Sequence, residues 1–222
     1  IDPHHHLWDF RTYFVDTRYL LDEFLADLSG GHNIVSTVFI ECRAMYRADE
    51  SDPMRMVGET EFVNGIAAMS ASGQYGPTRI AAGIVGRADL ALGDAVSEIL
   101  ETHIAAGCGR FRGIRHAASW DKHDDIRNAH TDPPQGLLGD AKFRQGFARL
   151  APLNLSFEGW FYHTQISELT DLARAFPDTP IILNHFGGPL GIGPYAGKRE
   201  EIMVQWRKDI AELATCENVV AK

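Results

Sequence analysis

Short, strongly apolar runs alternate with longer amphipathic runs along this chain of 222 residues, and this alternation constrains the fold more than any other feature. Residues 34–40 are rich in β-branched side chains and almost continuously apolar, which is typical of a strand buried on both faces. We expect further strands in the opening segment and at residues 79–85, 111–116, 153–161, 180–185 and 218–220. Apolar residues at helical spacing predict helices over residues 19–28, 56–72, 91–106, 143–150, 166–176 and 200–214.

Strands that alternate with helices are typical of parallel βαβ units and predict an α/β fold. Such units build either an open doubly wound sheet or a closed TIM (β/α)8 barrel, and both place functional residues at the carboxyl ends of strands. In this chain, polar side chains follow several different strands: Glu41, Arg115, His116, His163 and His185. Because all strand ends of a barrel face one mouth, this pattern favours a barrel over an open sheet, and we expect one domain over residues 1–222.

The charge balance limits the kinds of partner. The chain carries 21 Lys and Arg against 30 Asp and Glu, a net charge of -9, whereas binding to nucleic acid or an anionic membrane needs a basic face. No apolar run reaches the roughly 18 residues that predict a membrane-spanning helix. The three cysteines follow no paired spacing, so we expect no disulfide framework and a cytoplasmic location. A small-molecule substrate fits these properties, and the oligomeric state stays open.

The opening segment contains three consecutive histidines that could form part of a metal site. Residues two apart in a strand point to the same side, so His4 and His6 should project together while His5 faces the other way. Two imidazoles at this spacing can hold one divalent metal such as zinc. The alternative is a surface histidine cluster at a frayed terminus. His163 and His185 favour the metal site, because each follows an apolar strand.

Several segments together resemble the amidohydrolase superfamily, and more narrowly its amidohydrolase-2 branch of sugar-lactone and 2-pyrone-4,6-dicarboxylate lactonases. The segments that carry this resemblance are DPHHHLWD, FYHTQ and LNHFGGP, with VFIE, GIVG and GIRH between them. The resemblance implies a distorted TIM barrel with its site at the C-terminal mouth. It also implies that His4, His6 and His163 bind the metal and that His185 orients water or substrate. A metal would lower the pKa of bound water to roughly 7, and a general base would take its proton.

The chain departs from the superfamily pattern in two respects. Members with two metals often carry a bridging carboxylated Lys at the end of strand four, but residues 112–116 contain no Lys, so one metal is expected. Catalysis without a metal stays open, because some lactonases of this branch need none. The superfamily Asp after strand eight has no counterpart in this chain. We therefore expect the natural protein to continue past Lys222 with the eighth strand and its Asp.

Four further residues are candidates for substrate binding. Arg115 could bind a substrate carboxylate or hydroxyls, or pair with a loop, and His116 follows it directly. Glu41 could be a metal ligand, a substrate acceptor or an arginine partner. Tyr46 lies in the loop after the second strand, where it could cover a sugar or be a surface aromatic.

Two loops have compositions that suggest other roles. Residues 187–197 contain a nominal GxGxxA, but the segment lies late in the chain, includes Pro194 and precedes a helix that starts only near Glu200. We interpret it as a mouth loop rather than a dinucleotide site. Residues 119–140 are rich in Asp without the spacing of a calcium loop, so we expect a solvated loop that shapes the pocket.

The function expected from these features is a metal-dependent hydrolase. It would open a lactone of a sugar acid, or of a related dicarboxylate, in carbohydrate catabolism. Two alternatives stay open: a metal-dependent decarboxylase of the same superfamily, and a catalytically inactive barrel that acts as a binding protein.

Overall fold

A computed structural model describes residues 1–10 and 18–222 of the chain. These residues form two compact units. Unit 1 consists of Ile1–Ala88 and Glu98–Ile114, and unit 2 consists of Asp89–Ser97 and Arg115–Lys222. In both units parallel strands alternate with helices, which confirms the predicted α/β class.

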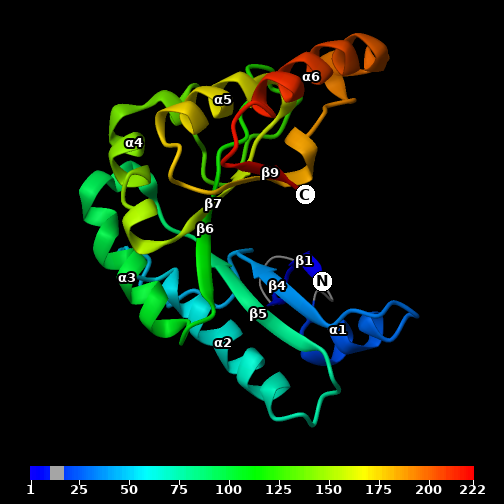
Figure 1. The fold of residues 1–222 in the computed structure, drawn as a ribbon, viewed down its shortest axis with the longest axis vertical. Helices are drawn as coiled ribbons and strands as arrows, with labels where there is room; N and C mark the ends of the chain where they lie inside the picture. Colours follow the sequence, from blue (N-terminus) through cyan, green and yellow to red (C-terminus); the bar gives the residue numbers. More distant parts are fainter. Residues whose placement is uncertain (11–17) are drawn as a thin grey trace. The chain divides into compact units, whose positions relative to one another are not determined.

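Unit 1 is built on strands that pair in parallel in their order along the chain: β1 (Asp2–His5), β4 (Ser36–Ile40), β5 (Arg79–Gly86) and the first part of β6 (Phe111–Ala117). Its helices are α1 (Leu21–Leu28), α2 (Val57–Ala71) and most of α3 (Val96–Ala106). Helix α2 packs along β5 (Figure 1). Phe39, Ile84 and Val63 are fully buried between these layers, so burial of apolar side chains holds strands and helices together.

Unit 1 also contains a small antiparallel ribbon that the sequence did not predict. Strand β2 (Trp8–Asp9) pairs with β3 (Arg18–Tyr19), and the ring of Trp8 lies 5.4 Å from that of Tyr19. Each strand has only two residues. That is too short for any hydrophobic period to be visible in the sequence.

Unit 2 is built on β7 (Ser156–Trp160), β8 (Ile181–Leu183) and β9 (Val219–Ala221), which also pair in parallel in chain order. Its helices are α4 (Ala141–Phe147), α5 (Ile166–Ala175) and α6 (Arg199–Leu213), and α5 lies beside α6 (Figure 1). The short 3-10 turns are η1 (Leu90–Ala95), η2 (Leu137–Gly139), η3 (Ala151–Leu153), η4 (His163–Gln165), η5 (Asn184–Gly187) and η6 (Gly193–Tyr195).

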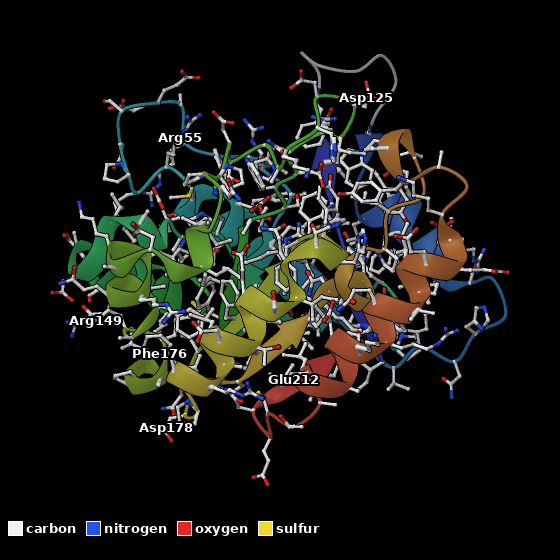
Figure 2. All side chains as sticks on the ribbon, turned by 90° about the horizontal axis from the view of Figure 1, so that it is seen from above. Arg55, Asp125, Arg149, Phe176, Asp178 and Glu212 are labelled. Atoms are coloured by element: carbon white, nitrogen blue, oxygen red, sulfur yellow. The ribbon has the colours of Figure 1, made fainter. Side chains whose placement is uncertain are left out.

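Aromatic packing forms the core of unit 2. Phe143 and Phe147 of α4 and Phe157 of β7 are fully buried, with ring centroids 5.1 to 6.3 Å apart. Charged side chains such as Arg149 and Glu212 lie exposed on the outside of this unit (Figure 2). The segregation is the expected result of burying apolar area while ionised groups keep their water.

Two strands of unit 2 are shorter than the sequence predicts. The expected strand over residues 153–161 begins only at Ser156, because Ala151–Leu153 forms a 3-10 turn that ends at Asn154 in the left-handed region. The expected strand over residues 180–185 ends at Leu183, and His185 lies in the turn that follows, with φ 51°. His163 follows the strand, as expected, and begins η4.

Seven strands of the described residues are parallel. An eighth strand, closure of the barrel and the single domain stay predictions. Among residues 1–10 and 18–222, no helix is long and apolar enough to cross a membrane.

Candidate functional site

His4 of β1 and His6, directly after this strand, lie together in unit 1. Their Nε2 atoms lie 3.2 Å apart, and the two rings meet edge to face at 86°. Nδ1 of His6 lies 2.7 Å from the carbonyl oxygen of Ile40, at the end of β4. Since a carbonyl can only accept, Nδ1 carries the proton and donates it, which leaves the Nε2 of His6 with a lone pair.

His5 lies on the other side of β1, as strand alternation predicts. It is buried, its ring stacks on Phe24 of α1 at 4.3 Å and its edge meets Phe39 at 5.8 Å. Burial lowers the pKa of His5 to about 4, so the ring is neutral at neutral pH. His5 is therefore a core residue.

The His4–His6 pair fits a divalent metal. Two nitrogens bound to one tetrahedral zinc at about 2.0–2.1 Å are separated by about 3.3 Å, close to the 3.2 Å between these Nε2 atoms. The bond from His6 to Ile40 is the kind of second contact that fixes a metal-binding imidazole. Among the described residues of either unit, no three His, Cys, Asp or Glu side chains are grouped for a metal, so the pair needs a further ligand.

A hollow of about 430 Å³ lies beside this pair in unit 1. Its walls include His4 and His6 together with the aromatic rings of Trp8, Tyr19 and Phe24. The hollow is large enough for a small molecule.

A buried acidic pair lies after β4 in unit 1. Glu41 follows the strand directly, and Glu59 of α2 accepts the backbone N–H groups of Cys42 at 2.9 Å and Ala44 at 2.8 Å through its Oε1 atom. Burial and the neighbouring Glu41 carboxylate raise the pKa of Glu59. Glu59 was not among the predicted site residues. Its signal in the sequence was a carboxylate at a buried position of α2, beside Val57 and Thr60.

Tyr46 lies against this acidic pair. Burial, then the charges of Glu59 and Glu41, raise the pKa of the Tyr46 hydroxyl, so it stays protonated. The guanidinium of Arg55 lies 5.7 Å from the centre of the Tyr46 ring. The structure thus brings together two of the predicted substrate-binding residues, Glu41 and Tyr46, and the ring is only partly exposed.

Arg115 and His185 are brought together in unit 2. Arg115 is buried on β6, with its guanidinium 5.6 Å from the centre of the Trp160 ring. Burial, then the positive charges of Arg115 and Lys222, lower the pKa of His185, while the charge of Glu158 opposes them. His185 is therefore a neutral imidazole near neutral pH.

The turn that carries His185 has an unusual backbone. His185 and Phe186 both have φ 51°, in the left-handed region that residues other than glycine rarely adopt. Each such residue costs on the order of 1 kcal/mol or more, and surrounding contacts must hold it. Two hydrogen bonds do so here: the Phe186 N–H donates to the carbonyl of Lys222, and the Trp206 indole donates to the carbonyl of Phe186.

His116 has a different environment from the one expected. It is buried, its edge meets the Phe143 ring of α4 at 5.4 Å, and Nδ1 lies 3.4 Å from the Leu90 N–H. Successive residues of a strand point to opposite sides, so His116 is turned away from the side that Arg115 occupies. This position favours a packing role, and the substrate-binding role of His116 stays a prediction.

His163 begins η4 in unit 2, three residues after Trp160, the last residue of β7. Its ring meets Tyr195 edge to face at 5.3 Å, and Nδ1 accepts the Leu190 N–H at 3.4 Å. Burial lowers the pKa of His163, and the charges of Asp121 and Asp209 oppose this. Leu190 and Tyr195 belong to the glycine-rich segment 187–197. This segment is a loop, as predicted, and it contacts His163 through these two residues. Tyr195 was not a predicted site residue.

The loop over residues 119–140 is less solvated than predicted. Asp121, Ile126 and Ala129 are buried. The Asp121 carboxylate can be buried because it accepts hydrogen bonds from the His123 N–H and the Tyr195 hydroxyl. Asp125 of the same loop is exposed (Figure 2).

The predicted metal ligands His4, His6 and His163 come from both units. That they converge on one metal therefore stays a prediction.

Comparisons with known proteins identify the family. The whole chain, residues 1–222, matches the model of the Amidohydro_2 family, described as "Amidohydrolase". An uncharacterized protein, y4mH, of Sinorhizobium fredii is 32% identical over 241 residues, which cover 100% of this chain and 71% of that protein.

Solved structures show a similar fold. An amidohydrolase from Burkholderia multivorans with bound zinc has a TM-score of 0.68 and 20% identity, covering 99% of this chain and 67% of the other. A probable 2-pyrone-4,6-dicarboxylic acid hydrolase from Acinetobacter baumannii, with citric acid bound, has a TM-score of 0.54 and 14% identity, covering 94% and 65%. With a family model that matches every residue, the chain belongs to the amidohydrolase-2 family.

Proposed function

We propose that this amidohydrolase is a metal-dependent hydrolase that opens the lactone of a sugar acid, or of a related dicarboxylate, by attack of an activated water. The observation that carries the proposal is the His4–His6 pair, whose Nε2 atoms are 3.2 Å apart and whose tautomer is set by the bond from His6 to Ile40. The Acinetobacter baumannii protein of similar fold, a probable 2-pyrone-4,6-dicarboxylic acid hydrolase, supports the substrate class.

In this proposal His4 and His6 hold one divalent cation, and His163 is the third protein ligand. His163 would bind through Nε2, so its proton would move to Nδ1 and the 3.4 Å hydrogen bond from the Leu190 N–H would be lost. Imidazole nitrogen is a good ligand for zinc, which is why zinc is the proposed metal. When bound, such a cation polarises the lactone carbonyl and lowers the pKa of water. Catalysis by the protein groups alone is the alternative, and removing the metal distinguishes the two.

The remaining roles belong to side chains of the chain itself. His185, neutral because its pKa is lowered, can accept a hydrogen bond and orients the water or the substrate. Arg115 offers a planar guanidinium that suits a carboxylate or two sugar hydroxyls. Glu41 accepts a hydrogen bond from a substrate hydroxyl, and Tyr46 beside it covers the lactone ring of the substrate.

The test is a panel of aldonolactones and a pyrone dicarboxylate, with acid release followed by a pH indicator. The wild type loaded with zinc should hydrolyse at least one of them. His6→Ala should reduce kcat by about a hundredfold or more, whereas His32→Ala, which changes an exposed histidine of the same unit, should not. Wild-type rates in His6→Ala would contradict the metal site. Release of carbon dioxide without acid release from the lactones would point to a decarboxylase instead.

A further inference from the structure

Asp121 joins two loops of unit 2 that are far apart in the sequence. It lies in the loop after β6, and its side chain is only 3% exposed. Oδ2 of Asp121 accepts a hydrogen bond from the Tyr195 hydroxyl at 2.6 Å, and Tyr195 belongs to the glycine-rich loop after β8. A buried, charge-assisted bond of this length is stronger than a bond between neutral groups.

The same carboxylate also orients His123. Oδ1 of Asp121 accepts the backbone N–H of His123 at 3.0 Å and its Nδ1–H at 2.7 Å. Burial alone would raise the pKa of Asp121, but the hydrogen bonds from Tyr195 and His123 outweigh it and lower that pKa. Burial and the bond to Asp121 raise the pKa of Tyr195 to about 12. Asp121 thus stays ionised and Tyr195 stays a donor at neutral pH.

A second contact shows that the two loops pack closely. Gly193 has φ 53°, and a Cβ atom at this position would lie 3.0 Å from the Cβ atom of Asp125 and 3.4 Å from Ile126. A larger residue would strain the backbone and push the loops apart. Both Gly193 and the Asp121–Tyr195 hydrogen bond therefore keep the loop over residues 119–140 in contact with the loop over residues 187–197.

The loop fixed in this way forms the surroundings of His163. The Tyr195 ring meets the His163 imidazole edge to face at 79°, with ring centres 5.3 Å apart. This contact restricts how the imidazole can turn.

We propose that Asp121 is a positioning residue, which acts through Tyr195 to hold residues 187–197 against His163 and so to fix the orientation of that imidazole. The proposal rests on the proposed hydrolase function, because only that function makes His163 a site residue. The structure gives Asp121 no part in the chemistry itself, since its oxygens are occupied by Tyr195 and His123.

Kinetics of variants test the proposal on the lactone that the wild type hydrolyses fastest. Tyr195→Phe removes one hydroxyl and keeps the ring, and we expect kcat to fall by about tenfold with KM within about twofold. The kcat of Asp121→Ala should fall at least as far. The kcat of Asp121→Asn should fall less, because an amide can still form hydrogen bonds to both Tyr195 and His123.

The double variant of Tyr195→Phe and Asp121→Ala should have the same kcat as Asp121→Ala, because both changes break the same hydrogen bond between Tyr195 and Asp121.

Asp124→Asn is the matched control, since it removes an exposed charge from the same loop. It should leave kcat and KM unchanged. If Tyr195→Phe keeps the wild-type kcat and only lowers the thermal midpoint, the bond is merely structural and the proposal is wrong.

Hydrogen exchange of residues 187–197 without substrate provides a readout that does not depend on activity. Exchange should be faster in Tyr195→Phe than in the wild type, and unchanged in Asp124→Asn. Unchanged exchange in Tyr195→Phe would overturn the proposal. If the zinc-loaded wild type hydrolyses no lactone, the hydrolase function fails, and the exchange result alone then decides whether Asp121 positions the loop.

Discussion

Acid should destabilise this protein through His103, a fully buried residue of α3 in unit 1. Its Nε2–H donates to the carbonyl of Arg87 at 2.9 Å, and its Nδ1 lies 2.8 Å from the Thr60 hydroxyl, which can donate to it. The ring stacks on Phe111 at 4.9 Å. The neutral imidazole is therefore fully hydrogen-bonded. A second proton would add charge where no carboxylate of the described residues bonds to the ring.

Burial lowers the pKa of His103 from 6.5 to about 4. Because the folded pKa is the lower one, the unfolded chain binds the proton first as the pH falls. Stability is therefore fully present above about pH 6.5 and is lost as the pH falls toward 4. With 1.36 kcal/mol per pKa unit, the loss between pH 7 and pH 4.5 is about 2 to 3 kcal/mol.

The assay is urea unfolding at pH 7 and pH 4.5 for the wild type and for His103→Gln, which cannot titrate. The variant should lose about 2 to 3 kcal/mol less than the wild type over this interval. His32→Gln, at an exposed histidine, should behave like the wild type. The same pH dependence in His103→Gln and the wild type would refute the reasoning.

Three further predictions follow from individual contacts. Gly146→Ala should lower the free energy of unfolding, measured in urea, by about 1 to 3 kcal/mol, because the new Cβ atom would lie 2.2 Å from the Leu90 carbonyl oxygen. An unchanged free energy of unfolding would show that the backbone can shift to make room for the methyl group. His5→Ala should lower the thermal midpoint but keep bound zinc, whereas His6→Ala should lose zinc by elemental analysis, and the reverse pattern would exclude the pair. His185→Asn should keep its thermal midpoint within a few degrees but lower kcat by about a hundredfold, and full activity would make His185 structural.

Most of the helices and strands could be predicted because each has a strong period of its own. The apolar run at residues 34–40 corresponds to β4 (Ser36–Ile40), and the helix predicted over residues 56–72 corresponds to α2 (Val57–Ala71). Both elements bury apolar side chains, Phe39 and Ile40 in β4 and Val57, Val63 and Ala67 in α2, and these apolar residues are visible in the sequence. The alternation along β1 likewise predicts that His4 and His6 share a side.

The parts of the site that could not be predicted depend on partners far along the chain. Asp121 was expected in a solvated loop, but its carboxylate is buried because Tyr195, 74 residues later, donates to it. Similarly, the strand before His185 ends at Leu183, since contacts to Lys222 and Trp206 hold a left-handed turn there. Neither partner can be recognised from local composition.

Zinc titration of the metal-free protein, with lactone hydrolysis measured at each point, tests the metal-dependent mechanism most directly. We predict that hydrolysis rises in proportion to bound zinc and stops rising at about one zinc per chain, because the His4 and His6 Nε2 atoms are spaced for one cation. Full hydrolysis by protein that carries no zinc, unchanged as zinc is added, would contradict a mechanism that depends on this pair.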